Sequence, residues 1–434
     1  MRANPSLFFP LFLWLAIAVL VTVYPTLLIY WQISGVFLLL IAFYDAWQMR
    51  RIVTPSVQRQ VSGSLPLGVW SEVTLVLYNA TGHTQQVEVF DDYPPHSDLQ
   101  GLPRHLVIPA TTEVTLHYRI RPQQRGNTQF NGIHLLIYSP WQLWKQHRYC
   151  PLQTQLRVYP NFAAVTKYAL FAVENRLGQL GVRKLQRRGE GLEFHQLREY
   201  RSGDTLRQIN WNATSRLKKL ISKEYQDERD QQVLFLLDCG RRMLAQDDAL
   251  SHFDHTLNAI LLLTYVALRQ GDALGLLTFS GEQRWIAPRK GVSTLNLVLN
   301  TVYDLQPSLQ ASDYLEAASQ LILRQRRRAL VILVSNLRDE ESDELLPAIK
   351  LLREKHLVLL VSLQERIINA VLEQPIFNFE EALCYAATQT YVQHRRQAHE
   401  SLRNQGILCL DVEPNQLPVM MVNQYLEIKR GGML

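Results

Sequence analysis

The sequence predicts a membrane-anchored multidomain protein with two N-terminal transmembrane helices, an immunoglobulin-like β-sandwich and a doubly wound α/β domain. Three observations support this prediction. Residues 7–44 contain no charged side chain, residues 55–160 contain short alternating runs, and residues 231–434 alternate buried-strand and helical patterns. A basic connector at residues 174–230 joins the last two parts.

The overall composition is that of a folded protein with a mild positive charge. The chain of 434 residues has room for two soluble domains, and 47% hydrophobic residues are enough for packed cores. A net charge of +6 suits an anionic membrane surface as much as nucleic acid. The 4 cysteines contain no CxxC pair and do not have the spacing of a disulfide framework. We therefore expect reduced thiols and a cytosolic compartment.

The uncharged N-terminal run is too long for one membrane span. At ~1.5 Å per residue a single helix over residues 7–44 would measure roughly 57 Å, nearly twice the ~30 Å hydrocarbon core. We predict a hairpin within residues 1–52, with spans at about 7–24 and 26–44 and a break at Pro25. A signal peptide is the alternative, but no short apolar core with a cleavage site stands out.

The charges that flank the hairpin predict its orientation. Arginines occur at both outer ends of the hairpin: Arg2, Arg50, Arg51 and Arg59. The turn around Pro25 carries no charge, so the positive-inside rule places both ends in the cytoplasm. Asp45, at the exit of the second span, is expected at the level of the lipid headgroups rather than as a proton site within the membrane.

The β-rich stretch at residues 55–160 consists of alternating runs separated by turn residues. The clearest predicted strands are Val73–Tyr78, Gln86–Phe90, Val114–Arg119 and Ile133–Tyr138. Strands at spacings of roughly 8–12 residues are typical of an immunoglobulin-like sandwich. We find no catalytic pattern in this stretch and expect a spacer or docking module.

The connector is basic but also contains many acidic residues. Basic side chains at Arg183, Lys184 and Arg187 precede the aromatic residues Tyr200 and Trp211, a combination that can bind single-stranded nucleic acid. Glutamates and aspartates are interleaved throughout residues 174–230, which favours intramolecular ion pairs. We therefore predict no nucleic-acid partner.

Several short motifs in the connector occur together in a fixed order. They are Gly189–Phe194, Leu197–Tyr200, Gly203-Asp204, Arg207–Trp211 and Ser215-Arg216. On these residues the sequence resembles the signature of a bacterial domain-of-unknown-function family, number fifty-eight. The stretch Ser139–Trp144 (SPWQLW) is similar, in altered form, to that family's short motif near the end of its β-domain.

The resemblance implies a von Willebrand factor A-like domain and association with a MoxR-type AAA+ ATPase. It also implies a two-pass protein of the bacterial inner (plasma) membrane with cytoplasmic soluble domains. The residues expected to contact a partner are Glu193, Phe194, Arg198, Tyr200, Gly203, Asp204, Arg207 and Trp211. Within this set we expect Trp211 to be a buried anchor, and Arg198 and Arg207 to lie at the surface.

The C-terminal region predicts a doubly wound sheet. Continuous apolar runs predict strands buried on both faces: Gln232–Leu237, Ala273–Phe279, Ala329–Ser335, Leu357–Leu363 and Ile407–Leu410. Helical spacing occurs at Phe253–Arg269, Glu344–Lys355 and Phe379–Arg403 and near the C-terminus, and Arg284–Ile286 reads as an edge hairpin. Strands alternating with helices favour a mostly parallel sheet with right-handed crossovers.

The resemblance also identifies a candidate cation site. In von Willebrand A-like domains Asp-x-Ser-x-Ser follows the first strand and binds a divalent cation with a later Thr and Asp. Asp238 is present, but Gly240 and Arg242 occupy the hydroxyl positions, and Asn336 stands where the later Asp is expected. We therefore treat Asp238 as a degenerate site at which Mg²⁺ is not expected. An ion pair with Arg241, Arg242 or a signature arginine is the preferred role.

No motif in the chain predicts an enzyme. The sequence lacks GxxxxGK[ST] and a strand-linked GxGxxG, so nucleotide hydrolysis would come from a partner. His252 and His255 could form half of a zinc site, but no third ligand is evident, and a solvated helix start is preferred. The leading hypothesis is a non-enzymatic, membrane-anchored adaptor or scaffold. The alternative is a metal-dependent hydrolase that uses the Asp238 face.

Overall fold

The computed structural model describes residues 1–24, 27–161, 193–201, 209–226, 231–247, 250–337 and 342–433. The chain divides into two compact units, Met1–Tyr159 and Pro160–Leu434. The first unit contains the N-terminal helices and the β-sandwich. The second contains the signature module and the α/β domain.

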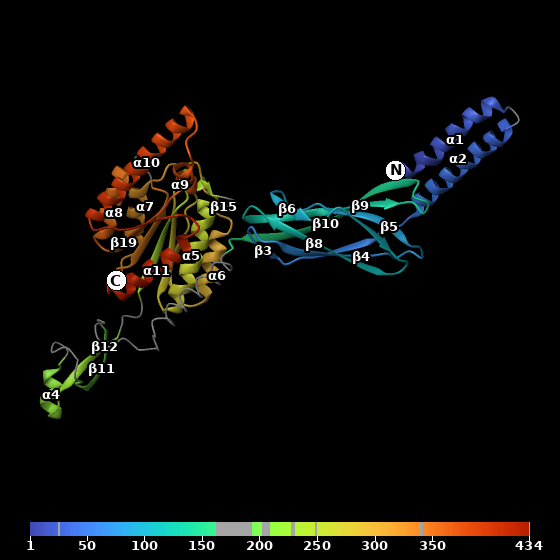
Figure 1. Cartoon of the computed structure of the whole chain (residues 1–434). Coiled ribbons are helices and arrows are strands. Elements are labelled where there is room, and N and C mark those ends of the chain that lie inside the picture. Colours follow the sequence, from blue (N-terminus) through green and yellow to red (C-terminus); the bar gives the residue numbers. More distant parts are fainter. Residues whose placement is uncertain are drawn as a thin grey trace. The chain divides into compact units, whose positions relative to one another are not determined.

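The two N-terminal apolar segments are helices. Helix α1 (Pro5–Val23) and helix α2 (Leu28–Arg51) lie side by side (Figure 1). Both are long and apolar enough to cross a membrane. The predicted second span ended at Tyr44, whereas α2 continues to Arg51 without a break. The predicted break at Pro25 lies outside the described residues.

A pair of tryptophans packs the two helices together. The rings of Trp14 and Trp31 are stacked with centroids 4.3 Å apart. Each indole Nε1 donates a hydrogen bond to the backbone oxygen of the other tryptophan, at 3.1 and 3.0 Å. A Cβ atom at Gly35 would lie 2.7 Å from Cζ2 of Trp14, so glycine at this position permits the close contact.

The following region is an antiparallel β-sandwich. One sheet has the order β1-β10-β9-β5-β7, with β3 paired to β10, and the other has the order β2-β4-β8-β6. The strands are β1 (Arg2–Ala3), β2 (Ser56–Gln60), β3 (Ser64–Pro66), β4 (Ser71–Tyr78), β5 (Gln85–Asp91), β6 (Ser97–Gln100), β7 (Arg104–Ile108), β8 (Glu113–Pro122), β9 (Gly126–Tyr138) and β10 (Trp144–Tyr159). Alternation places Val73, Leu75 and Leu77 in the core, as predicted.

A buried ion pair connects the two sheets. Arg59 of β2 donates from Nε to Oδ2 of Asp91 on β5 at 2.9 Å, and the hydroxyl of Tyr118 donates to the same oxygen at 2.5 Å. Both charged side chains are almost fully buried. Arg59 therefore does not flank the membrane, which corrects its use in the orientation argument. Arg2, Arg50 and Arg51 are exposed.

The α/β domain is built on a six-stranded sheet with the order β17-β16-β13-β18-β19-β20. Only the edge strand β17 is antiparallel among the strands of this sheet. The strands are β13 (Gln232–Asp238), β16 (Ala273–Phe279), β17 (Trp285–Arg289), β18 (Leu330–Ser335), β19 (Leu357–Leu363) and β20 (Leu408–Val412). The predicted buried strands and the edge hairpin are thus confirmed.

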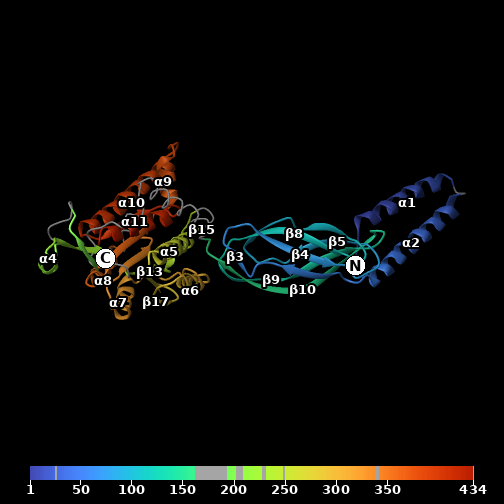
Figure 2. The same cartoon turned by 90° about the horizontal axis from the view of Figure 1, so that it is seen from below.

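Helices cover both faces of this sheet (Figures 1 and 2). Helices α5 (His252–Arg269), α6 (Ser293–Val302) and α11 (Leu417–Arg430) pack on one face. Helices α7 (Tyr314–Arg324) and α8 (Ser342–Arg353) pack on the other, where Leu402 of α10 (Phe379–Asn404) also contributes. Helices α6, α7 and α9 (Arg366–Glu373) were not predicted from the sequence.

The connector contains a small folded hairpin, which we call the signature module (residues 193–201 and 209–226). Strand β11 (Glu193–Glu199) pairs antiparallel with β12 (Ile221–Gln226), and helix α4 (Trp211–Leu217) lies between them in the sequence. The side chain of Asn210 caps α4 by accepting a hydrogen bond from the Ala213 N–H at 3.3 Å.

Candidate functional site

The candidate site lies at the carboxyl end of β13, where the strand order of the sheet reverses. Chain connections leave this point in opposite directions, toward β16 and toward β18. Asp238, the last residue of β13, is fully buried there. It accepts hydrogen bonds from the Ser335 hydroxyl at 2.6 Å and from the Gly240 N–H at 2.8 Å.

Ser312 supplies a second hydroxyl to Asp238. Its Oγ lies 2.9 and 2.7 Å from the two carboxylate oxygens. A Cβ atom at residue 240 would lie 2.6 Å from Ser312 Oγ, so the glycine makes space for this hydroxyl. The sequence analysis looked for hydroxyls at residues 240 and 242 and missed Ser312. The sequence signal that could have located Ser312 is its position directly before Asp313. Asp313 caps α7, because its side chain accepts a hydrogen bond from the Glu316 N–H at 2.9 Å.

The expected ion pair of Asp238 with an arginine is wrong. Within the described part of the chain, hydroxyl groups and a backbone N–H bind this carboxylate, and no arginine does. Burial raises the pKa of Asp238, and the hydrogen bonds from Ser335 and Ser312 oppose that rise. The two hydroxyls therefore offset part of the free-energy cost of burying the charged carboxylate.

A second polar network adjoins the Asp238 cluster. Asn336 donates from Nδ2 to Oε1 of Glu365 at 3.2 Å and lies 3.5 Å from Nδ1 of His252. Nε2 of His252 lies 2.9 Å from Oδ2 of Asp247. Asn336 and His252 are fully buried, so the expected solvated helix start at His252 is wrong. The network joins the carboxyl end of β18 to the start of α5, which indicates a structural role.

The donors around Asp238 do not fit a Mg²⁺ site. Mg²⁺ prefers carboxylate oxygens and water in near-octahedral geometry. Asp238 contributes a single charge, the hydroxyls of Ser312 and Ser335 are directed at it, and the amide of Asn336 is turned to Glu365. The described residues also contain no group of three or more His, Cys, Asp or Glu side chains arranged to hold a metal ion.

The signature module presents apolar side chains to solvent. Trp211 is 67% exposed, Leu217 61%, Leu220 47% and Leu197 44%. The prediction that Trp211 is a buried anchor is therefore wrong. The physical reason is size: α4 has seven residues, none of them buried, and the small core of the module is made by Ile209 and Ile221.

The other predicted contact residues are partly within this module. Arg198 donates from Nη1 to the backbone oxygen of Glu199 at 3.1 Å, and the Tyr200 N–H donates to the Leu220 oxygen at 2.9 Å. Glu193 and Phe194 lie on β11. Gly203, Asp204 and Arg207 lie outside the described residues.

A protein-family model described as "Protein of unknown function DUF58" matches residues 196–372. Over these residues the chain belongs to the DUF58 family. The DUF58 region runs from β11 of the signature module through Asp238 to α9, so it contains both the buried Asp238 cluster and the exposed apolar side chains of the module. It leaves out the N-terminal helices, the β-sandwich and helices α10 and α11.

Solved structures resemble parts of the chain at low identity. Salmonella alpha-2-macroglobulin is 20% identical over 24% of this chain and 7% of that chain, with a TM-score of 0.20. The CARDB domain of a Pyrococcus furiosus protein is 13% identical over 24% of this chain and 95% of that chain, with a TM-score of 0.17. Proximal thread matrix protein 1 from the mussel byssus is 11% identical over 47% of this chain and 45% of that chain, with a TM-score of 0.25. These likenesses bear on neither activity nor partners. Comparison with curated protein sequences gives no match.

Outside the DUF58 region, the SPWQLW turn (residues 139–144) binds helix α2. The Ser139 hydroxyl and the Trp141 N–H donate to the carboxylate of Asp45 at 2.5 and 3.2 Å. The indole of Trp144 donates to the Ala42 backbone oxygen at 2.8 Å. Asp45 is 1% exposed, so it links the helix to the β-sandwich.

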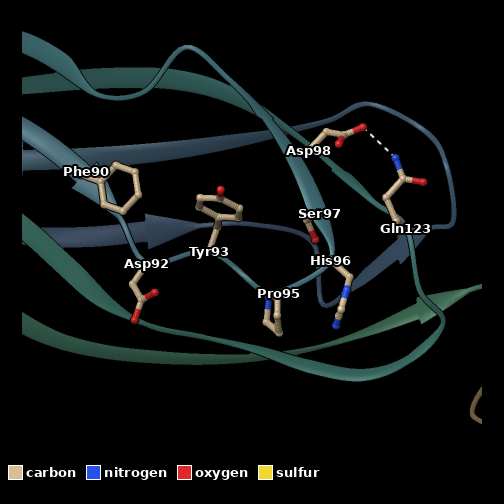
Figure 3. Close-up of a pocket in the computed structure, with 8 residues that line it drawn as sticks. All are labelled: Phe90, Asp92, Tyr93, Pro95, His96, Ser97, Asp98 and Gln123. Carbon is tan, nitrogen blue, oxygen red and sulfur yellow. Dashed lines mark hydrogen bonds between the residues drawn. The ribbon is translucent and has the colours of Figure 1, made fainter.

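The β-sandwich also contains an open pocket of about 560 Å³ (Figure 3). Its lining includes Tyr93, His96 and Asp98. The carboxylate of Asp98 accepts hydrogen bonds from Arg121 and from Gln123, the latter at 2.7 Å, and these bonds lower its pKa. The ionised carboxylate of Asp98 thus connects β6 to the end of β8. The residues that line the pocket suggest no catalytic reaction.

Proposed function

We propose that this chain is a membrane-anchored, non-enzymatic adaptor that acts through protein–protein contacts of its signature module. The observation that carries the proposal is the exposure of Trp211, Leu217, Leu220 and Leu197 on one small hairpin. Exposed apolar patches on soluble surfaces commonly mark interaction sites. The module also begins the DUF58 region, so the surface belongs to the family part of the chain.

The size of the available binding energy supports this role. Burying one leucine side chain contributes about 1.5–3 kcal/mol. Tryptophan is enriched among the residues that dominate interface energies, where truncation costs about 2 kcal/mol or more. Burial of Trp211, Leu217 and Leu220 against a partner would therefore contribute to the free energy of binding.

For the partner we propose a MoxR-type AAA+ ATPase, as the family resemblance implies. The sequence lacks a phosphate-binding motif of its own, so the ATPase would supply nucleotide hydrolysis. We further propose that the α/β domain is von Willebrand A-like. Its strand order reverses next to Asp238, and an antiparallel strand closes one edge, which supports that assignment.

We assign the Asp238 cluster a structural role and propose that it binds no divalent cation. Its single carboxylate already accepts hydrogen bonds from Ser312, Ser335 and Gly240. A metal-dependent hydrolase would need further acidic ligands or a base beside it, and no observation favours that alternative. For location we propose the bacterial inner membrane, with the soluble domains in the cytoplasm.

The test is a binding measurement with the full chain in lipid nanodiscs and the purified MoxR-type ATPase of the same organism. We expect saturable binding that Trp211→Ala weakens by roughly 30-fold, the equivalent of about 2 kcal/mol. Because Trp211 is 67% exposed, this variant should change stability by less than about 0.5 kcal/mol.

The matched control is Phe377→Ala, which removes an 83% exposed aromatic side chain outside the signature module. It should leave the affinity unchanged. If Phe377→Ala weakens binding and Trp211→Ala does not, the partner surface lies before α10 and our assignment of the signature module is wrong.

A further inference from the structure

The SPWQLW turn contacts both N-terminal helices at their membrane-boundary ends. On α2 it donates to Asp45 and to the backbone oxygen of Ala42. On the side of α1, Nδ2 of Asn4 donates to the Gln142 oxygen at 2.7 Å, and the Asn4 N–H donates to the Leu143 oxygen at 2.9 Å. The turn is therefore fixed against two independent chain segments.

Both segments place the turn at the same depth. From Leu28 to Asp45, helix α2 rises roughly 25 Å at ~1.5 Å per residue, close to the ~30 Å thickness of the hydrocarbon core. Helix α1 spans Pro5–Val23, roughly 28 Å, and Asn4 directly precedes it. A hairpin that crosses the bilayer thus holds the turn at the boundary between hydrocarbon and headgroups.

Three exposed aromatic rings gather at this level. Trp141 is 52% exposed, Tyr44 46% and Trp47 43%. The ring centroids of Tyr44 and Trp141 are 5.6 Å apart, and those of Tyr44 and Trp47 are 6.2 Å apart. Tryptophan and tyrosine combine an apolar body with a polar tip and are enriched at membrane–water interfaces.

A positive charge lies over one of these rings, and further exposed arginines occur in the same two chain segments. The guanidinium of Arg51 lies 3.7 Å from the centroid of the Trp47 ring, and Arg50 and Arg2 are exposed. The one acidic group of the contact, Asp45, is buried and hydrogen-bonded to the turn. Basic residues next to a membrane span attract anionic lipid headgroups by about 1 kcal/mol each.

We propose that Trp141, together with Tyr44 and Trp47, inserts into the headgroup layer of an anionic bilayer. The β-sandwich is then itself part of the membrane anchor, because one of its turns binds lipid and is locked to α2. This inference rests on the proposed membrane anchor and extends it from the helices to the adjoining domain.

The test uses the full chain in nanodiscs that contain phosphatidylglycerol, with an environment-sensitive fluorophore on one introduced cysteine at a time. The test positions are Trp141→Cys and, as a second variant in the same turn, Pro140→Cys. The exposed Cys384 is replaced by serine. Burial raises the pKa of the Cys150 thiol, and it raises that of Cys409 to about 11, so both react slowly at neutral pH.

Two reference positions calibrate depth. Phe37→Cys lies on an exposed position of α2, eight residues before Asp45 in the sequence. Gln124→Cys is exposed in the turn between β8 and β9. Strand β9 has 13 residues and spans roughly 40 Å at ~3.3 Å per residue, so Gln124 lies at the opposite end of that strand from the SPWQLW turn.

We expect nitroxide lipids labelled at the headgroup to quench residues 141 and 140, acyl-chain nitroxides to quench residue 37, and neither to quench residue 124. If residue 37 is quenched but residues 141 and 140 behave like residue 124, the insertion of the turn is refuted and the helical anchor stands. If residue 37 is not quenched either, the membrane anchor itself fails.

Discussion

The hydroxyl oxygen of Ser312 lies 2.9 and 2.7 Å from the two carboxylate oxygens of Asp238, although 74 residues separate them in the sequence. The contact ties the loop before α7 to the end of the first strand of the α/β sheet. Gly240 makes this contact possible, because a Cβ atom there would lie only 2.6 Å from the Ser312 hydroxyl oxygen. The carboxylate is thus held by neutral donors in a fully buried site.

Removing either hydroxyl should cost stability in a pH-dependent way. Hydrogen bonds to charged groups contribute about 1.5–3 kcal/mol, so Ser312→Ala and Ser335→Ala should each lower the free energy of unfolding by that amount at pH values above the pKa of Asp238. The pKa of Asp238 is raised above its ordinary value of 3.8, so the folded state holds the proton more tightly than the unfolded state. The contribution of Asp238 to the stability of the fold therefore falls as the pH rises from 3.8 through the raised pKa.

Removing either serine hydroxyl raises the pKa of Asp238 further. The resulting loss of unfolding free energy should therefore be complete above the raised pKa. It should shrink at lower pH, where the carboxyl is protonated. Thermal unfolding of the detergent-solubilised chain at several pH values measures this. Ser319→Ala is the control, because this serine is exposed on α7 and bonds only the Leu315 backbone oxygen among the described contacts. If the serine variants lose the same stability at all pH values, the hydroxyls do not act through the charge of Asp238.

Divalent cations should leave the stability of the full chain unchanged. A ligand that binds only the folded state stabilises it by about 2.7 kcal/mol at 100 times its dissociation constant, which a melting experiment detects. We expect no shift with Mg²⁺ or Mn²⁺. Gly240→Ser, which restores one expected ligand type, should destabilise the fold because its Cβ would lie 2.6 Å from Ser312 Oγ. A cation-dependent rise that disappears in Asp238→Ala would establish the metal site that we exclude.

The full chain is the appropriate material for these measurements. Met49 of α2 is 1% exposed and belongs to the core of the β-sandwich. A fragment that begins after the predicted hairpin would lose this side chain, and deleting a buried methionine typically costs about 2–5 kcal/mol.

The orientation of the hairpin has its own test. A topology reporter fused to the C-terminus should be active only in a form that works in the cytoplasm, and one inserted at Pro25 only in a form that works outside it. The arginines that support this are the exposed Arg2, Arg50 and Arg51, without Arg59, which is buried against Asp91. Activity of an exported reporter at the C-terminus would reverse the orientation.

The parts of the fold that depend on local patterns could be predicted from the sequence. Strand β16 has the predicted bounds Ala273–Phe279, because a strand buried on both faces is a continuous apolar run between polar ends. The Ser312–Asp238 contact could not be predicted in this way. It depends on a loop that only the folded sheet brings to Asp238, and no periodic pattern marks such a loop.

Two further features of the structure could not be predicted, because they also depend on tertiary contacts rather than on local sequence patterns. Apolar character suggested that Trp211 is buried, but burial depends on how many neighbours the module can provide, and a seven-residue helix beside two short strands provides few. Asp45 was expected at the level of the lipid headgroups, and that prediction stays open. What the sequence could not show is that its carboxylate accepts a hydrogen bond from Ser139, 94 residues later in the chain.

The most direct measurement of the adaptor function is site-specific photo-crosslinking in native membranes, with a photoreactive phenylalanine analogue at residue 211 and, as control, at residue 377. Both positions are exposed aromatic residues, at 67% and 83%. We predict that residue 211 crosslinks to a MoxR-type ATPase, identified by mass spectrometry, and that residue 377 does not. Crosslinks from residue 211 only to the chain's own α/β domain would show that the signature module covers an internal surface, and would contradict the account.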